Sequence, residues 1–362
     1  MGPHEILGHH LLVAEQGRRI VYRLPIDGDE PFGEPGHIQS INGEKMKVAF
    51  IGLGNVGSKL AGSVLRNGHA LMVCDVDPAA VAPFVDAGAG SHESPAELAR
   101  FADVVVTCLP EPRISAEVLE REDGVLAGLS PGKIWAEMST TDASEVLRLG
   151  KRVEALGAHA LDCPVSGGCH RAATGNIAIF AGGRREAFER ALPLLSSMGR
   201  RILHTGELGS ASRLKVMTNY LATANLVSLT EALVTASKAG MDLPTAYEAI
   251  RISSGNSFVH ETESQVILNG SRNIDFTMGL VRKDIGLFQD LAEQHGVELE
   301  LSPLLIKIFE DGIARYGANE NSPNIIKRLE EQANTLAVAP GFPAEMVDDE
   351  PEEPGGEVTP AR

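Results

Sequence analysis

The stretch Phe-Ile-Gly-Leu-Gly-Asn-Val-Gly at residues 50–57 decides the fold. Its glycines, Gly52, Gly54 and Gly57, have the spacing GxGxxG. An apolar run of strand length precedes them, and a segment with apolar residues four positions apart follows them. A strand that turns through such glycines into a helix is the context in which this spacing binds a dinucleotide. The alternative is a tight turn in an α/β domain that binds no nucleotide.

Each glycine of this loop has a physical task in that interpretation. The first permits the tight turn, the second lets a pyrophosphate approach the backbone, and the third lets helix and strand pack closely. The N-terminus of the helix attracts the phosphate charge. The candidate cofactor-binding residues of the loop are Gly52, Gly54, Asn55, Val56 and Gly57.

Asp75 ends the next apolar run, 23 positions after Gly52. A carboxylate at this place accepts hydrogen bonds from the adenosine ribose hydroxyls and would repel a 2′-phosphate. Its neighbours Val76 and Asp77 include no arginine to hold that phosphate, so NAD is favoured and NADP is less favoured. Asp75 could instead only cap the following turn, although Asp77 before Pro78 is better placed to begin a helix.

The same alternation of strand and helix continues outward from the glycine loop to about residue 208. Short apolar runs, several rich in Val or Ile, are typical of buried parallel strands. Amphipathic segments between them carry helix signals, so residues 46–208 predict an α/β, doubly wound, Rossmann-type sheet. The expected strands are 47–52, 70–75, 103–108, 133–138, 159–163, 176–181 and 201–204.

The pattern changes at residue 209. Residues 210–239 contain neither proline nor glycine and predict one long, mostly apolar helix that must be covered on most sides. No strand pattern recurs up to residue 335, so 209–335 predicts an all-α C-terminal domain entered through the long helix. Further helices are expected at 243–253, 257–269, 277–295, 301–315 and 321–335.

The two ends of the chain lack these patterns. Residues 1–45 show no sustained period and are expected to be an extension of uncertain order. Residues 336–362 hold five prolines and seven acidic residues against one arginine, which predicts a disordered acidic tail.

Composition narrows the classes of function. The 362 residues carry 32 Lys and Arg against 49 Asp and Glu, a formal net charge of −17 that argues against nucleic-acid binding. No apolar run is long enough to span a membrane, and the four cysteines are scattered without CxxC spacing. A cytoplasmic protein with reduced thiols is expected, and no metal site is predicted.

Two further motifs suggest where a substrate binds. Residues 162–168 read Asp-Cys-Pro-Val-Ser-Gly-Gly, and Ser166, Gly167 and Gly168 offer a hydroxyl and unhindered N–H groups for a carboxylate. An ordinary turn would have the same composition. Lys215 and Asn219 lie four apart on one face of the long helix. Lys215 is a candidate acid/base if burial lowers its pKa, and otherwise a lysine whose ammonium reaches water.

The fourth motif is Lys283-Asp284-Ile285-Gly286. Lys283 could reach a cofactor, or it could form an ordinary surface ion pair. Together the motifs GLGNVG at 52–57, DCPVSGG at 162–168, GSASRLKVMTN at 209–219 and KDIGLFQD at 283–290 resemble the β-hydroxyacid dehydrogenase family, over about residues 46–335.

The resemblance implies a set of roles. Lys215 would be the catalytic lysine that exchanges a proton with the substrate hydroxyl, while a hydride passes between the same carbon and the nicotinamide. Ser166, Gly167, Gly168 and Asn219 would bind a small carboxylate-bearing substrate, a 2- or 3-hydroxy acid or a semialdehyde. Further cofactor-lining positions are Leu109, Pro110, Thr140 and Lys283. The family also implies a homodimer or homotetramer.

Departures from the family pattern keep other interpretations open. Thr218 stands where a second asparagine is common, and Arg171 follows the glycine pair, where it could meet a second acidic group or face solvent. An imine reductase shares this architecture but lacks the lysine, and a non-catalytic member of the fold would have lost it. The single tryptophan, Trp135, is expected in the core.

Overall fold

The computed structural model describes residues 4–7, 10–15, 18–23 and 45–359, which fall into two compact units, residues 1–42 and 43–362. The first unit holds a three-stranded antiparallel sheet in the order β1-β2-β3. Its strands, which no period in the sequence indicated, are β1 (His4–Leu7), β2 (His10–Glu15) and β3 (Arg18–Arg23).

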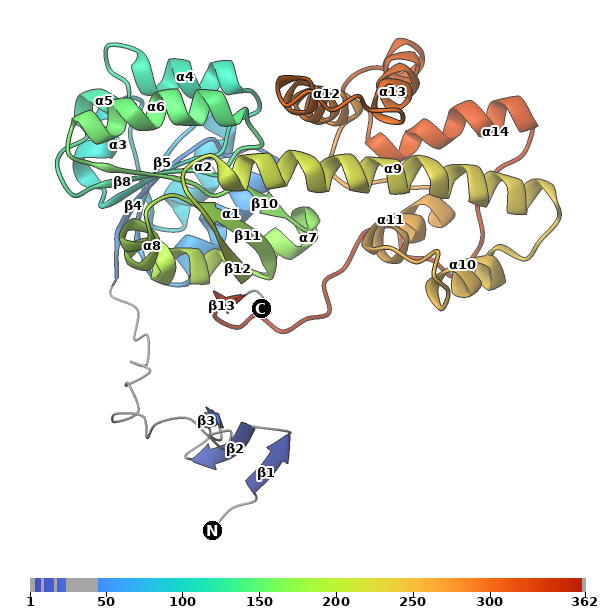
Figure 1. The fold of residues 1–362 in the computed structure, drawn as a ribbon, viewed down its shortest axis with the longest axis horizontal. Coiled ribbons are helices and arrows are strands. Elements are labelled where there is room, and N and C mark those ends of the chain that lie inside the picture. Colours follow the sequence, from blue (N-terminus) through green and yellow to red (C-terminus); the bar gives the residue numbers. More distant parts are fainter. Residues whose placement is uncertain (1–3, 8–9, 16–17, 24–44, 360–362) are drawn as a thin grey trace. The chain divides into compact units, whose positions relative to one another are not determined.

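The second unit contains a ten-stranded sheet in the order β13-β12-β11-β9-β8-β7-β4-β5-β6, with β10 paired to β11 (Figure 1). The order reverses at β4, which lies between β5 and β7, and ligands bind at such a switch point beyond the carboxyl ends of the strands. The strands are β4 (Lys47–Ile51), β5 (Ala70–Cys74), β6 (Gly90–Ser91), β7 (Val104–Thr107), β8 (Ile134–Glu137), β9 (His159–Asp162), β10 (Val165–Ser166), β11 (Ile177–Gly182), β12 (Gly199–Gly206) and β13 (Gly356–Glu357).

The expectation of parallel strands throughout needs a correction. The strands from β6 to β9 are parallel, but β11 pairs antiparallel with β9, and β12 and β13 follow the direction of β11. After β9 the chain forms β10 and a short helix at the carboxyl edge of the sheet. The chain has not returned to the opposite edge when β11 begins, and β11 therefore runs antiparallel to β9.

Alternation along the strands explains the two cores of the sheet. Val48 and Phe50 of β4 pack on one face, and Ala49 and Ile51 pack on the other. Successive side chains point to opposite faces, so a strand that is apolar at every position is covered by helices on both sides. Trp135 of β8 is fully buried, as expected, and its indole N–H donates to Thr107 Oγ1 at 2.9 Å. The helices of this domain are α1 (Asn55–Arg66), α2 (Pro78–Asp86), α3 (Pro95–Phe101), α4 (Pro112–Glu120), α5 (Val125–Gly128), α6 (Ala143–Ala155), α7 (Gly168–Ala173) and α8 (Arg185–Met198).

The helical domain is arranged around α9 (Ser210–Lys238), the 29-residue helix that the sequence predicted (Figure 1). Buried residues of α9, α11, α12, α13 and η1 form one apolar core, which covers the long helix on several sides. Among the described residues no helix has the length and apolar character needed to cross a membrane. The remaining helices are α10 (Leu243–Arg251), α11 (Phe258–Asn269), α12 (Met278–Gln294), α13 (Ser302–Tyr316), the 3-10 helix η1 (Ser322–Ile326) and α14 (Lys327–Ala333).

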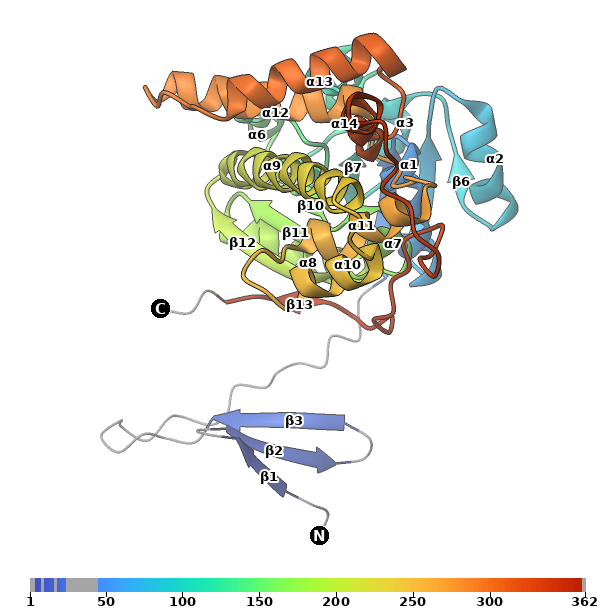
Figure 2. The ribbon, with the colours of Figure 1, turned by 90° about the vertical axis from the view of Figure 1, so that its right-hand side faces the viewer.

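The acidic C-terminal segment is not the disordered tail expected from its composition. Residues 336–359 follow the surface of the unit, and β13 adds to the edge of the sheet beside β12 (Figure 2). The segment buries little apolar surface of its own, which is why composition suggested disorder. It is held instead by backbone hydrogen bonds between β13 and β12 and by the buried contacts of Asp348, and ion pairs such as Arg185–Glu357 add to these.

Candidate active site

One cleft, with a volume of about 1600 Å³, collects the candidate residues of both domains. It is bounded by the carboxyl ends of β4, β5 and β7, by the loop before α7, and by α9, α11 and α12. Every residue that the sequence assigned to the cofactor or the substrate lines this cleft: Gly52, Gly54, Asn55, Val56, Gly57, Asp75, Leu109, Pro110, Thr140, Ser166, Gly167, Gly168, Lys215, Asn219 and Lys283.

The glycine loop has the shape that a dinucleotide needs. Gly52 has φ +98°, and a Cβ on it would collide with the carbonyl oxygen of Cys108. A Cβ on Gly57 would collide with the carbonyl oxygen of Gly52, so this glycine lets α1 pack against the turn. A Cβ on Gly54 would meet no atom within 4 Å, which leaves its backbone open to the cleft. The loop therefore fits a pyrophosphate at the N-terminus of α1.

Asp75 lies at the end of β5, where a ribose would bind. Its Oδ2 accepts the N–H of Leu53 at 2.6 Å, and its Oδ1 accepts the N–H of Asp77 at 2.9 Å. A carboxylate has about four acceptor positions, so these bonds orient it and leave capacity for ribose hydroxyls. Asp77 caps α2 through the N–H of Ala79, as the sequence indicated. The structure also brings Arg121 to this part of the cleft, although Asp123 already holds it at 2.8 Å.

A buried carboxylate that the sequence did not single out shapes the cofactor loop after β7. Glu137, 1% exposed at the end of β8, accepts the N–H of Ser139 at 2.9 Å and also its hydroxyl. The Ser139 Oγ in turn accepts the N–H of Leu109 at 2.8 Å. These hydrogen bonds hold the backbone at Leu109, where the segment Leu109–Pro110 begins. The sequence does not show this contact, because Glu137 and Leu109 are far apart along the chain.

The candidate substrate loop is a glycine turn between β10 and α7. Gly167 has φ +130° and Gly168 has φ +88°, backbone conformations that residues other than glycine rarely adopt. Ser166 precedes them on β10, which pairs with Ile179 and Ala178 of β11. The loop is thereby attached to the sheet on one side and to α7 on the other, and Ser166, Gly167 and Gly168 line the cleft.

Lys215 heads a polar network that joins two helices. Its Nζ donates to Asn219 Oδ1 at 2.7 Å, and Asn219 Nδ2 donates to Asp284 Oδ2 of α12 at 2.5 Å. Lys283 Nζ donates to the carbonyl oxygen of Thr140 at 2.8 Å and lies 3.1 Å from Asp284 Oδ1. The latter contact has ion-pair distance without hydrogen-bond geometry, so Oδ1 accepts no hydrogen bond from the described residues.

Burial and charge set the acidity of this lysine. Lys215 is 7% exposed, and desolvation lowers its pKa from 10.5 to about 8. The carboxylate of Asp284 opposes that shift, and the ammonium of Lys283 adds to it. A lysine with this pKa exchanges protons near neutral pH, which an exposed lysine does poorly. Arg213, by contrast, is exposed on the same helix, as expected.

Asp162 positions the beginning of α9. Its carboxylate accepts the N–H of Gly209 at 2.8 Å and both the N–H and the hydroxyl of Ser212, at 2.7 and 2.9 Å. A carboxylate at a helix N-terminus satisfies free N–H groups and complements the helix dipole. The end of β9 therefore anchors the long helix about one turn before Lys215. In the sequence analysis Asp162 was only the first residue of the motif at 162–168, and no role was assigned to it.

Sequence reasoning also missed a carboxylate that lines the cleft. Glu263 of α11 lines the cleft, and its buried Oε2 has no partner among the described residues. Burial raises its pKa from 4.5 to about 8. Its signal in the sequence is weak, since a glutamate in a helix is normally a solvated residue.

Arg171 has a partner that the sequence analysis did not consider. It lies neither in the substrate cleft nor free in solvent: its guanidinium is 3.2 Å from Glu350 of the C-terminal segment and stacks over Phe258 at 4.9 Å. The side chain is 23% exposed, so this arginine belongs to a contact between α7 and the end of the chain.

Fold and cleft together define a two-domain NAD(P)-dependent oxidoreductase. Residues 47–206 match the family described as the NAD-binding domain of 6-phosphogluconate dehydrogenase. Residues 209–329 match the family described as NAD-binding of NADP-dependent 3-hydroxyisobutyrate dehydrogenase.

Similar proteins of known activity narrow the class. The chain is 33% identical to 2-(hydroxymethyl)glutarate dehydrogenase of Eubacterium barkeri, over 82% of this chain and 99% of that one. The structure of Mycobacterium tuberculosis 3-hydroxyisobutyrate dehydrogenase with L-serine superposes with a TM-score of 0.72 at 27% identity, over 79% and 99% of the chains. An imine reductase of Myxococcus stipitatus, at 17% identity and a TM-score of 0.54 over 79% and 99%, shares the fold. The protein belongs to the β-hydroxyacid dehydrogenase family that includes 3-hydroxyisobutyrate dehydrogenase.

Proposed function

We propose that the protein transfers a hydride between NAD and a small 2- or 3-hydroxy acid or its semialdehyde, with Lys215 as acid/base. One observation carries the proposal. The buried Lys215, its pKa lowered to about 8, lines the same cleft as the glycine cradle and the loop Ser166–Gly168. A non-catalytic member of the fold has no need of a desolvated lysine, and an imine reductase lacks it.

The chain's own residues supply binding and proton transfer, while the bound nicotinamide supplies or accepts the hydride. In oxidation, neutral Lys215 takes the proton of the substrate hydroxyl at Nζ. In reduction, charged Lys215 returns it to the carbonyl oxygen. Asn219 holds Nζ at 2.7 Å through its Oδ1, so the proton acceptor stays at one place in the cleft.

The substrate loop provides the carboxylate site. The hydroxyl of Ser166 and the N–H groups of Gly167 and Gly168 bind the carboxylate and hold the hydroxyl-bearing carbon near Lys215. Both glycines have positive φ, and a side chain at either position would be strained. This backbone conformation supports a site made of N–H groups.

The cofactor preference is proposed from Asp75. Its carboxylate would accept hydrogen bonds from an unmodified ribose and repel a 2′-phosphate, which favours NAD. Arg121 is the residue that could reverse this preference, and its ion pair with Asp123 argues against that. Asp75→Ala should weaken the binding of NADH more than that of NADPH, as measured by the fluorescence of the two cofactors. A parent enzyme that already prefers NADPH would refute the assignment.

Replacement of Lys215 tests the mechanism. Lys215→Met keeps most of the side-chain volume and Lys215→Ala removes it, and either change should lower turnover by about 10²–10⁴-fold. The affinity for NADH should stay within about twofold, because the lysine acts on the substrate. Lys238→Ala, at the exposed end of the same helix, is the matched control. Turnover equal to that of the control would exclude Lys215 as the acid/base.

A panel of acids identifies the substrate. The acids named with the similar proteins, 3-hydroxyisobutyrate, 2-(hydroxymethyl)glutarate and L-serine, are the first to test, by NADH formation at 340 nm. Turnover of one carboxylate-bearing compound supports the proposal. Tight NADH binding without turnover of hydroxy acids, together with reduction of a cyclic imine, would favour the imine reductase alternative.

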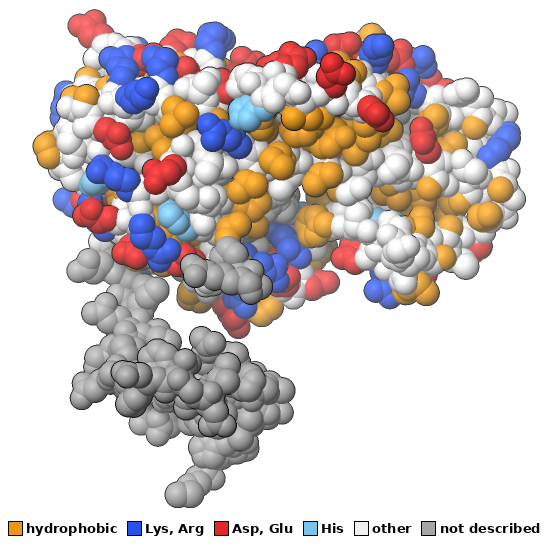
Figure 3. Space-filling model, in the orientation of Figure 1, with side chains coloured by type: hydrophobic (Ala, Val, Ile, Leu, Met, Phe, Trp, Pro, Cys, Tyr) orange, Lys and Arg blue, Asp and Glu red, His pale blue; other side chains and the backbone are white. Residues whose placement is uncertain are grey.

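Assembly as a homodimer or homotetramer is part of the proposal. Large apolar side chains are exposed on α9 and at the start of α13: Met217, Leu221, Leu301 and Leu304. In Figure 3 hydrophobic side chains gather along α9, with acidic and basic side chains interspersed around them. A second copy of the chain would cover such a face, and sedimentation velocity measures the mass. A cytoplasmic location remains a prediction from the sequence.

A further inference from the structure

The C-terminal strap, defined as residues 337–358, connects the helical domain with the edge of the sheet (Figures 1 and 2). At its start the N–H of Ala339 donates to Leu268 O, and Asn269 Nδ2 donates to Phe342 O, both at 2.8 Å. At its end β13 pairs with β12, and the N–H of Val358 donates to Ile202 O at 2.7 Å. The strap is therefore attached to the helical domain at one end and to the edge of the sheet at the other.

Between these two attachments the strap passes the substrate end of the cleft. Met346 lines the cleft, and its Cε lies 3.8 Å from the position that a Cβ on Gly168 would take. Gly168 ends the substrate loop and begins α7. An apolar, adaptable side chain from the strap thus borders the carboxylate site.

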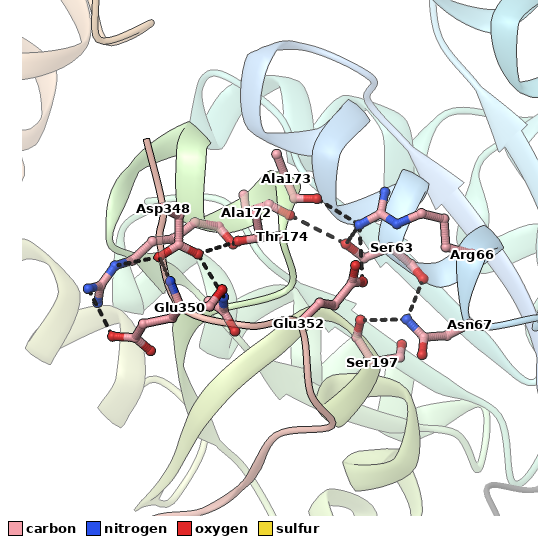
Figure 4. A network of polar contacts seen from close by, with 12 residues as sticks. Ser63, Arg66, Asn67, Ala172, Ala173, Thr174, Ser197, Asp348, Glu350 and Glu352 are labelled. Atoms are coloured by element: carbon pink, nitrogen blue, oxygen red, sulfur yellow. Dashed lines mark hydrogen bonds and ion pairs between the residues drawn. The ribbon is translucent and has the colours of Figure 1, made fainter. Parts of the chain in front are cut away.

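Asp348 attaches the strap to the far end of α7 (Figure 4). Its side chain is 2% exposed, and its Oδ2 accepts Asn176 Nδ2 at 2.7 Å and the hydroxyl of Thr174 at 2.5 Å. Burial acts to raise the pKa of Asp348, but these hydrogen bonds and the charge of Arg171 outweigh it and lower the pKa. The carboxylate is therefore ionised and fully engaged at neutral pH.

The other carboxylates of the strap meet arginines of the body at its surface. Glu352 lies 3.3 Å from Arg66, also drawn in Figure 4, and Glu353 lies 2.6 Å from Arg200. Exposed pairs of this kind contribute at most about 1 kcal/mol each. Asp348, which is buried and has several partners, is the contact expected to matter most.

The substrate loop depends on such support. Helix α7 has six residues, which is too short to be stable by itself. One end continues the glycine turn, and the residues after its other end, Thr174 and Asn176, are bonded to Asp348. The strap also lies beyond residue 329, where the match to the dehydrogenase family ends.

We propose that the C-terminal strap is part of the active site: Asp348 is a positioning residue for the substrate loop, and Met346 forms an apolar, specificity-determining wall beside it. The kinetic consequences rest on the proposed function. The order of the substrate loop and α7, which depends on the strap, can be tested whether or not the proposed function is correct.

Asp348→Ala tests the positioning role in the full-length enzyme. We expect the KM for the hydroxy acid to rise about tenfold, with kcat and the Kd for NADH within twofold, because the carboxylate site loosens while Lys215 and the cofactor cradle stay in place. Asp348→Asn keeps one acceptor oxygen and should restore part of the loss. Asp349→Ala removes the same charge from an exposed neighbour and is the control. Equal KM values for Asp348→Ala and Asp349→Ala would overturn the proposal.

Hydrogen exchange tests the position of the loop without any substrate. In the chain that ends at Ala344, and in Asp348→Ala, the amides of residues 165–176 should exchange at least tenfold faster than in the full chain, with those of 47–66 unchanged. Unchanged exchange at 165–176 in Asp348→Ala overturns the strap's role even if the panel of acids fails. The point variant covers the case in which the shortened chain does not fold.

Met346→Ala tests the wall. Removing this side chain should raise kcat/KM for the larger 2-(hydroxymethyl)glutarate relative to 3-hydroxyisobutyrate by about threefold or more. Val347→Ala, whose side chain is exposed, is the control. The same ratio in both variants would show that Met346 does not contact the substrate.

Discussion

Replacement of Asp284 by asparagine gives a directional test of the lysine network. Asp284 is 2% exposed and its carboxylate raises the pKa of Lys215, while burial lowers that pKa to about 8. The whole shift from 10.5 to about 8 corresponds to about 3 kcal/mol of differential stabilisation of the neutral amine. Asp284→Asn keeps an oxygen that can accept from Asn219 but removes the negative charge. An opposite charge at close range accounts for about 1–3 pKa units, so the pKa of Lys215 should fall by at least about one unit.

The assay is the pH dependence of kcat/KM in both directions at constant ionic strength. Oxidation needs neutral Lys215, so its kcat/KM should rise with pH and level off above about 8 in the parent enzyme. In Asp284→Asn this rise should move to lower pH by at least about one unit. Asp290→Asn, exposed on the same helix, should leave the profile in place. A profile that stays fixed or moves to higher pH in Asp284→Asn would refute the assignment of Lys215 as the titrating group.

The glycine loop and Glu263 provide two further predictions. Gly54→Ala should fold normally, because its Cβ meets nothing within 4 Å, but should weaken NADH binding by tenfold or more; Gly52→Ala should also lower the melting temperature, since its Cβ collides with Cys108. Equal melting temperatures for the two variants would contradict this distinction. For Glu263 the folded pKa of about 8 lies above the ordinary 4.5, so the folded state holds more protons and stability should fall as pH rises between these values. Urea unfolding of Glu263→Gln should lack this decline, and Glu261→Gln, an exposed neighbour, should retain it.

Local patterns predicted the secondary structure well where the stabilising contacts are local. Asp77 caps α2 two residues onward, and the absence of proline and glycine in 210–239 predicted the 29-residue α9. Ser94 shows the limit of such patterns. Ser94 and Glu97 have the Ser-x-x-Glu spacing that predicts a capping box, yet the Ser94 hydroxyl makes no cap to α3 and donates instead to Asp123 O, 29 residues away.

The residues of the candidate site also fall into those that local motifs predicted and those that only tertiary packing brings into contact. The motifs located Lys215, Asn219 and Lys283, since each belongs to a short pattern that can be recognised without knowing its neighbours. Their partners across the cleft, Asp284 Oδ2 and the carbonyl oxygen of Thr140, depend on how α9, α12 and the loop after β8 pack. No spacing rule relates residues 65 or 143 positions apart.

By itself, the sequence determined the glycine turn, the alternation of strand and helix, the long helix and the lysine on it. These follow from dihedral preferences and periodicity within about ten residues. The tertiary structure decided the pKa of Lys215, the lack of a partner for Glu263 Oε2 among the described residues, and the contact between Asp348 of the strap and Arg171 of α7. Desolvation and charge pairing depend on which atoms cover a group. Here the covering atoms come from segments far apart along the chain, which only folding brings together.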